Sequence, residues 1–203
     1  MSSFLGEPVR GFLDQLAART PTPGGGGAAA VTGAMAAGLV AMAARFSATR
    51  LPDAGELADQ ADELRRRLAQ LADMDARAYA AVLKALRLPR ETSQREVQRQ
   101  EALLGAALVP LEIAGIGARV AVMAAGLAEA GNPNLRGDAV TGAVLAAASA
   151  RSAACLVDIN VGLGGLDPGL SRRAAQAAAD AGDAAGGASA AKRASATGPV
   201  GTP

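Results

Sequence analysis

The chain contains no histidine, and this absence narrows the chemistry that it can perform. Histidine has the ordinary pKa closest to neutral, and it is both a frequent acid–base group and the commonest metal ligand. Its absence excludes histidine-based catalytic triads and zinc sites, and we expect no metal centre. Proton transfer near neutral pH must fall to a perturbed carboxylate, a lysine, a cysteine or a tyrosine.

Cysteine and aromatic residues are almost as scarce. Cys155 is the only cysteine, which excludes an internal disulfide and fits a reducing cytosol. Aromatic residues make up 2% of the 203 residues, tryptophan is absent, and alanine dominates. This composition favours closely packed helices over sheets.

An excess of charge of one sign is also missing. The net charge is +1 and the basic residues are scattered, so we expect no nucleic-acid partner. The first residues lack the basic and hydrophobic regions of a secretion signal. Together with the single cysteine, these features predict a cytoplasmic protein.

The stretch from Thr20 to Gly27 alternates two threonines with two prolines and ends in four glycines. The prolines exclude a helix here, and the glycines remove every Cβ where the next helix is about to begin. A helix start carries unpaired N–H groups and a partial positive charge, so it can seat a carboxylate, a phosphate or a polarised carbonyl. The alternative is a flexible linker, although linkers seldom place rigid prolines directly before glycines.

Residues 28–46 are predicted to form a helix without charge before Arg45. A stretch this apolar could be a transmembrane span. Against that alternative, it is built from alanine and glycine rather than leucine, and no tryptophan or tyrosine marks an interface. We interpret it as the central buried helix and expect no membrane partner.

The third predicted helix begins at Pro52 and Asp53 and has the clearest periodicity of the chain. Nine residues follow each other at steps of three or four: Leu57, Ala61, Leu64, Leu68, Leu71, Asp75, Ala78, Val82 and Leu86. Asp75 is the exception in this apolar stripe, and a core-facing carboxylate is costly unless it is paired, solvated or protonated. It is either a buried aspartate bonded to a backbone or hydroxyl group, or a carboxylate at the wall of a pocket with its pKa tuned by burial.

The remaining pattern completes an all-α, single-domain bundle of about six helices over residues 1–185. A short amphipathic helix spans residues 4–19, and a fourth helix, capped by Thr92 or Ser93, runs to about Ala130 with a kink or break at Pro110.

The last part of the chain begins with a turn, Gly131-Asn132-Pro133-Asn134. Asp138 can then cap a fifth helix that extends to about residue 162, and a sixth helix spans about residues 169–185. From Gly186 onward the composition is Gly/Ala/Ser/Pro, so residues 186–203 are predicted to be a disordered tail.

Several short motifs follow one another in order and together cover residues 12–163. They are Phe12-Leu13, Thr20-Pro21-Thr22-Pro23-Gly24-Gly25-Gly26, Asp73-Met74-Asp75-Ala76-Arg77-Ala78-Tyr79, Leu88-Pro89-x-x-Thr92, Val109-Pro110-Leu111, Gly131-Asn132-Pro133-Asn134, Asp138 and Ile159-Asn160. As an ordered set, they resemble the cyclodeaminase/cyclohydrolase family of folate enzymes. That family includes the C-terminal domain of formiminotransferase-cyclodeaminase and the stand-alone methenyltetrahydrofolate cyclohydrolases.

The resemblance implies an all-helical homodimer, a tetrahydrofolate site beside the glycines and a catalytic aspartate at Asp75. The substrate-binding residues that it implies are Thr22, Pro23, Gly24, Gly25, Gly26, Gly27, Asn132, Asn134, Asp138 and Asn160. Turn and cap chemistry is the alternative explanation of the two asparagines and the aspartate between positions 132 and 138. Two residues depart from the family's pattern, because Gly137 replaces a serine and Leu156 replaces an asparagine. Both changes remove polar groups that could line the pocket.

The first hypothesis is therefore an enzyme that hydrolyses 5,10-methenyltetrahydrofolate to 10-formyltetrahydrofolate, or cyclodeaminates formiminotetrahydrofolate, by carboxylate acid–base catalysis without a resident cofactor. The run of four glycines favours the cyclohydrolase. A second hypothesis is the same scaffold acting on a non-folate imine, amidine or iminium in a biosynthetic pathway, which Gly137 and Leu156 favour. A third is a non-catalytic helical dimer, against which Asp75 and the glycines argue.

Overall fold

The computed structural model describes residues 3–89 and 94–196, with side chains described up to residue 190. Within these ranges there are six α-helices, two short 3-10 helices and no strand. The helices are α1 (Val9–Ala17), α2 (Gly25–Arg45), α3 (Ala54–Leu86), α4 (Arg95–Ala130), α5 (Arg136–Gly164) and α6 (Pro168–Ala196), and the 3-10 helices are η1 (Phe4–Gly6) and η2 (Pro133–Leu135). The expected all-α bundle is confirmed.

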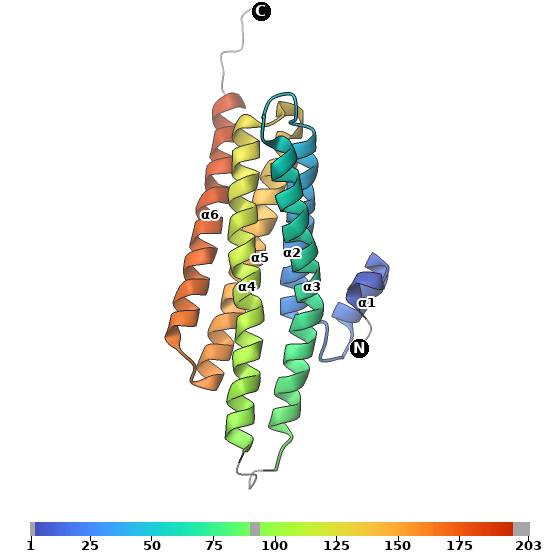
Figure 1. The fold of residues 1–203 in the computed structure, drawn as a ribbon, viewed down its shortest axis with the longest axis vertical. Helices are drawn as coiled ribbons and strands as arrows, with labels where there is room; N and C mark the ends of the chain where they lie inside the picture. Colours follow the sequence, from blue (N-terminus) through green and yellow to red (C-terminus); the bar gives the residue numbers. More distant parts are fainter. Residues whose placement is uncertain (1–2, 90–93, 197–203) are drawn as a thin grey trace, which may run out of the picture.

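Five long helices, α2 to α6, lie side by side in an elongated bundle, and short α1 projects from its side (Figure 1). Within the bundle α4 packs against α2, α3, α5 and α6, whereas α2 packs chiefly against α3 and α5. The central helix is thus α4, and the expectation that residues 28–46 form it is wrong. One side of α2 is buried, but Met35 on the other side is 54% exposed. The sequence of α2 is apolar on both sides, so its own pattern could not reveal which one faces outward.

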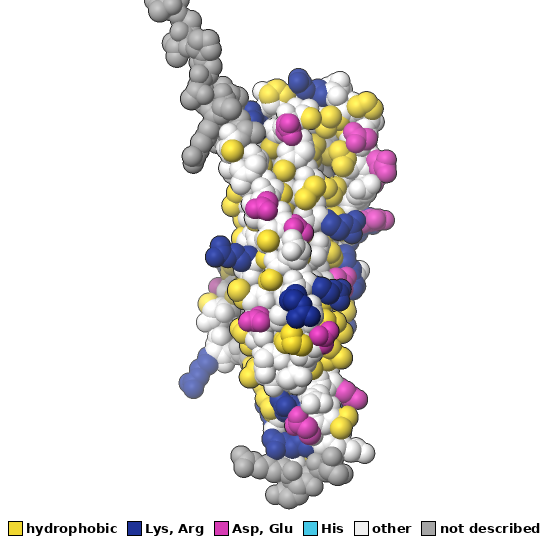
Figure 2. Space-filling model, turned by 90° about the vertical axis from the view of Figure 1, so that its left-hand side faces the viewer, with side chains coloured by type: hydrophobic (Ala, Val, Ile, Leu, Met, Phe, Trp, Pro, Cys, Tyr) yellow, Lys and Arg dark blue, Asp and Glu magenta, His cyan; other side chains and the backbone are white. Residues whose placement is uncertain are grey.

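The surface on the α6 side carries charged side chains of both signs scattered among apolar and small ones (Figure 2). Three helical segments, Gly25–Arg45, Arg95–Ala130 and 133–164, are long and apolar enough to cross a membrane by length and composition alone. In the first two, 56% of the most apolar window is buried inside the bundle itself.

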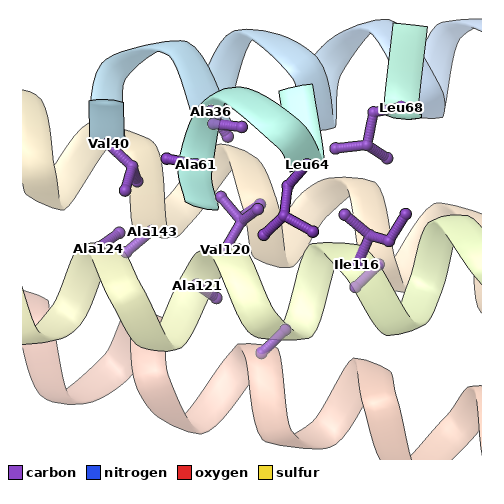
Figure 3. Packing of buried hydrophobic residues seen from close by; sticks show 14 of the residues in the cluster. Ala36, Val40, Ala61, Leu64, Leu68, Ile116, Val120, Ala121, Ala124 and Ala143 are labelled. Carbon is purple, nitrogen blue, oxygen red and sulfur yellow. The ribbon is translucent and has the colours of Figure 1, made fainter. Parts of the chain in front are cut away.

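The core is made largely of alanine, which lets the helices approach closely. Val40, Ala124 and Ala143 meet at the junction of α2, α4 and α5, and Leu64 of α3 faces Val120 of α4 (Figure 3). Buried Ser149 of α5 donates to the carbonyl oxygen of Ala29 at 2.7 Å. A Cβ at Gly33 would lie 2.7 Å from the Ser149 hydroxyl oxygen, so only glycine fits between α2 and α5 at that height.

Helix boundaries differ from the sequence-based expectations at both ends of the first helical segment and of α2. The segment predicted over residues 4–19 is divided into η1 and α1, because Pro8 stands before α1 as its N-cap. Helix α2 begins at Gly25 rather than at residue 28, so three of the four glycines form its first turn. Thr92 and Ser93, the expected caps of the fourth helix, lie outside the described residues.

Helices α4 and α5 also depart from their predicted form. Of the kink or break predicted at Pro110, the break does not occur, because helix α4 continues through that residue. Helix α5 begins at Arg136, with Leu135 as its N-cap, so Asp138 lies inside the first turn and is not the cap. The 3-10 turn η2 directly precedes α5, and this places the helix start three residues before the predicted one.

The predicted disordered tail is wrong for residues 186–196, which continue α6. Ala181, Ala185 and Ala188 are buried and belong to the main core cluster. Their spacing of four and three residues places them on one side of the helix, which packs against α4 and α5. Tertiary contact therefore stabilises a segment whose local composition predicts disorder. The rest of the predicted tail, residues 197–203, lies outside the described residues.

Candidate active site

A pocket of about 430 Å³ lies where the start of α2 meets α3, α4 and α5. Asp75, Tyr79 and Asn160 line it with Thr22 and three glycines, Gly24, Gly25 and Gly26. The rest of its wall is apolar: Pro21, Val82, Leu83, Leu86, Leu103, Ala106, Leu156, Ile159 and Leu163. No lysine or arginine of the described chain lines the pocket.

Asp75 lies against the N-terminus of α2. Its carboxylate accepts a hydrogen bond from the backbone N–H of Gly27. A Cβ built on Gly26 would overlap the same carboxylate group, so the close approach requires glycine at this position. The helix start thus holds an anion as the sequence predicts, but that anion is a side chain of the protein itself.

The pKa of Asp75 is raised, chiefly because burial removes water from the carboxylate, while the hydrogen bond from Gly27 opposes the shift. None of the salt bridges among the described residues involves Asp75. A half-buried carboxylate of raised pKa, without a countercharge and beside an apolar cavity, holds a proton to higher pH than an exposed aspartate does, which suits it to acid–base chemistry.

The segment before α2 is ordered around this carboxylate. Gly24 is the N-cap of α2, and Gly25 to Gly27 form the first turn, so the structure does not support the linker alternative. Gly27 is buried and contributes its N–H to Asp75. Pro23 is buried, and its peptide bond with Thr22 is cis. Neither Pro23 nor Gly27 lines the pocket, although the sequence predicts both as site residues.

Asn160 forms the part of the wall contributed by the C-terminal half of α5. Its side-chain nitrogen, Nδ2, donates to the carbonyl oxygens of Ala106 at 3.0 Å and Leu156 at 2.9 Å. Ala106 and Leu156 line the pocket as well. The amide therefore links α5 to α4 at the edge of the cavity.

The structure places Asn132, Asn134 and Asp138 at the opposite end of α2. The Asn132 amide nitrogen Nδ2 donates to the Phe46 carbonyl oxygen at 3.0 Å, and its Oδ1 accepts from the backbone N–H of Asn134 at 3.0 Å. These contacts match the turn-and-cap alternative for Asn132. The 21 residues of α2 separate this end from Asp75 by about 30 Å, so one chain does not bring the two groups together.

Sequence reasoning missed most of the apolar wall. Tyr79 and Val82 lie four and seven residues after Asp75, and the same face of α3 continues to Leu86. The helical spacing from Asp75 could have located these residues. The contributions of Leu103 and Leu163 depend on how α4 and α5 pack, and no local pattern marks them, whereas Ile159 belongs to the motif Ile159-Asn160.

The two departures from the family's pattern occupy different environments. Leu156 lines the pocket, and its side chain would lie 3.8 Å from a Cβ at Gly25. Gly137 is exposed in the first turn of α5, at the end away from the pocket. Only the change to leucine therefore alters the wall around Asp75.

A larger groove of about 940 Å³ lies between α3, α4 and α6. Arg67 of α3 and Glu112 of α4 form a two-bond ion pair at its rim, with N–O distances of 2.6 and 2.8 Å. None of the residues that the sequence predicts for the site lines this groove. The smaller pocket at Asp75 is therefore the candidate active site.

Comparison with known proteins identifies the family. The family model described as formiminotransferase-cyclodeaminase matches residues 8–167. The chain belongs to this family. It is 38% identical over 164 residues to a methenyltetrahydrofolate cyclohydrolase of Methylorubrum extorquens, covering 76% of this chain and 79% of the relative.

Other members of the formiminotransferase-cyclodeaminase family are also similar. The formimidoyltransferase-cyclodeaminase of Mus musculus is 35% identical over 127 residues, in a match that covers 55% of this chain and 23% of that protein. The crystal structure of a formiminotetrahydrofolate cyclodeaminase from Thermotoga maritima superimposes with a TM-score of 0.84 at 27% identity, covering 95% of this chain and 98% of that one.

Proposed function

We propose that this chain hydrolyses the methenyl bridge of 5,10-methenyltetrahydrofolate to yield 10-formyltetrahydrofolate. The observation that carries the proposal is the half-buried Asp75 carboxylate, which has a raised pKa and opens onto an apolar pocket. The similarity to a methenyltetrahydrofolate cyclohydrolase over most of both chains supports this choice of substrate.

The electrostatics of the pocket suit this substrate. The methenyl bridge joins N5 and N10 as a delocalised cation, and Asp75 is the only acidic side chain among the described residues that line the pocket. Lysine and arginine are absent from the described lining, so no positive side chain there opposes a bound cation. The apolar wall suits a flat heterocycle, because it removes both faces of the ring from water.

The reaction consists of the attack of one water molecule and two proton transfers. The water oxygen bonds to the bridge carbon, and Asp75 accepts a proton as this bond forms. The bond between the carbon and N5 then breaks, N5 gains a proton and the formyl group remains on N10. One proton is released overall. The N–H of Gly27 stabilises the Asp75 carboxylate between transfers, and a resident cofactor is not required.

Cyclodeamination of formiminotetrahydrofolate is the second candidate, and the name of the Thermotoga maritima relative favours it. There N10 attacks the formimino carbon and ammonia departs with a proton that Asp75 can supply. A non-folate imine or amidine is the third, which Leu156 favours, because leucine removes a polar group from the wall. In each case we place the enzyme in the cytoplasm.

The cyclohydrolase assignment is tested directly by mixing 5,10-methenyltetrahydrofolate with the purified protein and measuring the loss of the methenyl absorption band. Asp75→Asn keeps the size of the side chain but cannot exchange a proton, so kcat should fall by about 10² to 10⁴. Asp73→Asn is the matched control, because Asp73 receives hydrogen bonds from Ser3 and Phe4 outside the pocket. A folded, fully active Asp75→Asn protein would remove the aspartate from the mechanism.

We also propose that the chain forms a homodimer through the α2–α5 face. This face consists of two uncharged stripes of exposed or half-buried residues: Ala28, Thr32, Met35, Leu39, Met42 and Phe46 along α2, and Thr141, Val144, Ala148, Ser152, Cys155, Ile159 and Leu163 along α5. A groove of about 350 Å³ without a charged lining residue lies between the two helices. The α6 side differs, since charges are scattered over it (Figure 2). A large uncharged face is typical of an interface, and a second copy is the partner that this family resemblance implies.

Such a dimer accounts for the separation of the predicted site residues. The pocket at Asp75 lies at one end of the α2–α5 face and Asn132 at the other. A two-fold axis through the middle of the face, perpendicular to the helices, makes the two chains antiparallel. The pocket end of one chain then lies against the Asn132 end of the other. Asn134 and Asp138 of one chain then approach the pocket of the other, where they can contact the bound folate.

A further inference from the structure

The helix α4 carries a proline in its interior, and this residue leaves one backbone carbonyl without its usual partner. In a regular helix the N–H of residue 110 would donate to the carbonyl oxygen of residue 106. Pro110 has no N–H, and its ring pushes against that carbonyl. A buried carbonyl without a donor costs about 1–3 kcal/mol, so a replacement donor is expected.

Asn160 provides this replacement from a different helix. Its Nδ2 donates to the Ala106 oxygen at 3.0 Å and to the Leu156 oxygen at 2.9 Å. Leu156 is one turn earlier on the same helix as Asn160, whereas Ala106 belongs to α4. Both amide hydrogens are therefore used, one within α5 and one across the helix pair.

This arrangement fixes the orientation of the Asn160 amide. Rotation of the group by a half-turn would place Oδ1 against two carbonyl oxygens, which repel it. The oxygen Oδ1 remains as the only side-chain atom of Asn160 that is available for a ligand, and it can only accept. Because Asn160, Ala106 and Leu156 all line the pocket, this acceptor belongs to the site of Asp75.

We infer that Pro110 is a positioning residue that holds Asn160 as a hydrogen-bond acceptor for an N–H group of the substrate ring. The inference rests on the proposed function for the identity of the ring, a pterin with N–H and amino donors. The Ala106 carbonyl oxygen, which has no backbone donor at residue 110, is what orients the Asn160 amide. Replacing Pro110 should therefore alter ligand affinity without any contact between residue 110 and the ligand.

The Pro110→Ala variant restores the N–H at residue 110, which competes with Asn160 for the Ala106 oxygen. In the folate-free protein, the side-chain N–H₂ signals of Asn160, measured by nuclear magnetic resonance, should show one hydrogen that exchanges faster than in the parent. The same variant should bind tetrahydrofolate about three- to tenfold more weakly by calorimetry, with equal or higher thermal stability.

Gly115→Ala is the control for the change in helix propensity. It also raises the propensity of α4, and a Cβ there meets no atom within 4 Å. This variant should leave both the Asn160 signals and tetrahydrofolate affinity unchanged. In an Asn160→Ala background, Pro110→Ala should have no further effect on affinity, because the group that it orients is already absent.

The outcomes separate the two proposals. Unchanged Asn160 signals in Pro110→Ala would overturn the positioning role whatever the ligand is. Equal losses of affinity from Pro110→Ala in the parent and in the Asn160→Ala background would overturn it as well. A parent protein that shows the expected Asn160 signals but binds no tetrahydrofolate would contradict the proposed function and the pterin contact, while the orientation of Asn160 by Pro110 would stand.

Discussion

Asp75 and Gly26 are so close that the residue at position 26 determines where the carboxylate can lie. A Cβ at Gly26 would overlap the carboxylate, whereas a Cβ at Gly25 would lie 3.8 Å from the nearest Leu156 atom, an ordinary contact distance. The two neighbouring glycines thus have different roles. Gly26 leaves room for the Asp75 carboxylate, and Gly25 leaves its own part of the pocket wall without a side chain.

The two glycines should therefore respond differently to substitution. Gly26→Ala displaces Asp75 from the Gly27 N–H, so we expect kcat to fall by about 10² or more. Gly25→Val adds a side chain where the substrate lies, so we expect a raised KM and a smaller change in kcat. Steady-state kinetics of both folded variants measures the difference. Two variants with the parent's kcat and KM would show that the helix start is not part of the site.

The raised pKa of Asp75 has a consequence for stability. Between the ordinary pKa of an aspartate and the raised value, the folded protein binds more protons than the unfolded chain does. The contribution of Asp75 to the free energy of unfolding therefore decreases as pH rises through this window. Asp75→Asn removes the contribution, so the variant should gain stability relative to the parent as pH rises above about 4, the ordinary pKa of an aspartate. Thermal unfolding of both proteins tests this, and a difference in Tm that stays constant or reverses with pH would contradict it.

At the scale of helices, the sequence predicts the existence of each element better than its limits. The apolar stripe of α3 predicts a helix from residue 53 or so to Leu86, and the structure confirms it, because that stripe faces the core along most of its length. A break at Pro110 and a disordered tail from Gly186 onward, which the sequence predicts, do not occur in the described residues of α4 and α6. A donor from α5 compensates the proline, and buried alanines hold α6 beyond Gly186. Neither compensation is visible within the segment concerned.

The continuation of α6 can be tested at Ala188, which is 3% exposed in the core cluster. Ala188→Asp would bury an unpaired carboxylate and should lower the free energy of unfolding by about 3 kcal/mol, or roughly 6–12 °C in Tm. Ala190→Asp is the control, because residue 190 is exposed on the same helix. Equal melting temperatures for the two variants would mean that α6 does not pack beyond residue 185.

At the scale of the whole molecule, the sequence predicts only part of the way in which the candidate site is assembled. Asp75 and the glycines meet because the α3 stripe and the start of α2 each carry a local signal. Asn160 joins them through the packing of α5 on α4, which the motif order alone does not reveal. Asn132, Asn134 and Asp138 occur in the same ordered set of motifs, yet one chain holds Asn132 at Phe46. Sequence order carries no information on which chain of an assembly completes a site.

The proposed dimer predicts the effect of a charge on the α2–α5 face. Met35 is 54% exposed on α2, so Met35→Glu should leave the isolated chain folded and convert the dimer to a monomer, because the interface would bury an unpaired carboxylate. Val122→Glu is the matched control, since Val122 is 58% exposed on α4 outside that face. Light scattering at micromolar concentration measures both. A monomeric parent, or a parent that associates with lipid vesicles through this face, would contradict the assembly.

Mixed dimers test whether the two chains share the site. Asp75→Asn and Asp138→Asn should each be inactive if the Asp75 pocket of one chain requires Asp138 of the partner. A mixture of the two variants, unfolded and refolded together, forms half of its dimers from one chain of each kind, and each such dimer holds one site with both aspartates intact. Activity should then recover to about one quarter of the parent's value. The Met35→Glu background should abolish the recovery, because it separates the chains. An active Asp138→Asn variant would exclude that residue from the reaction, and two inactive variants without recovery would confine each site to a single chain.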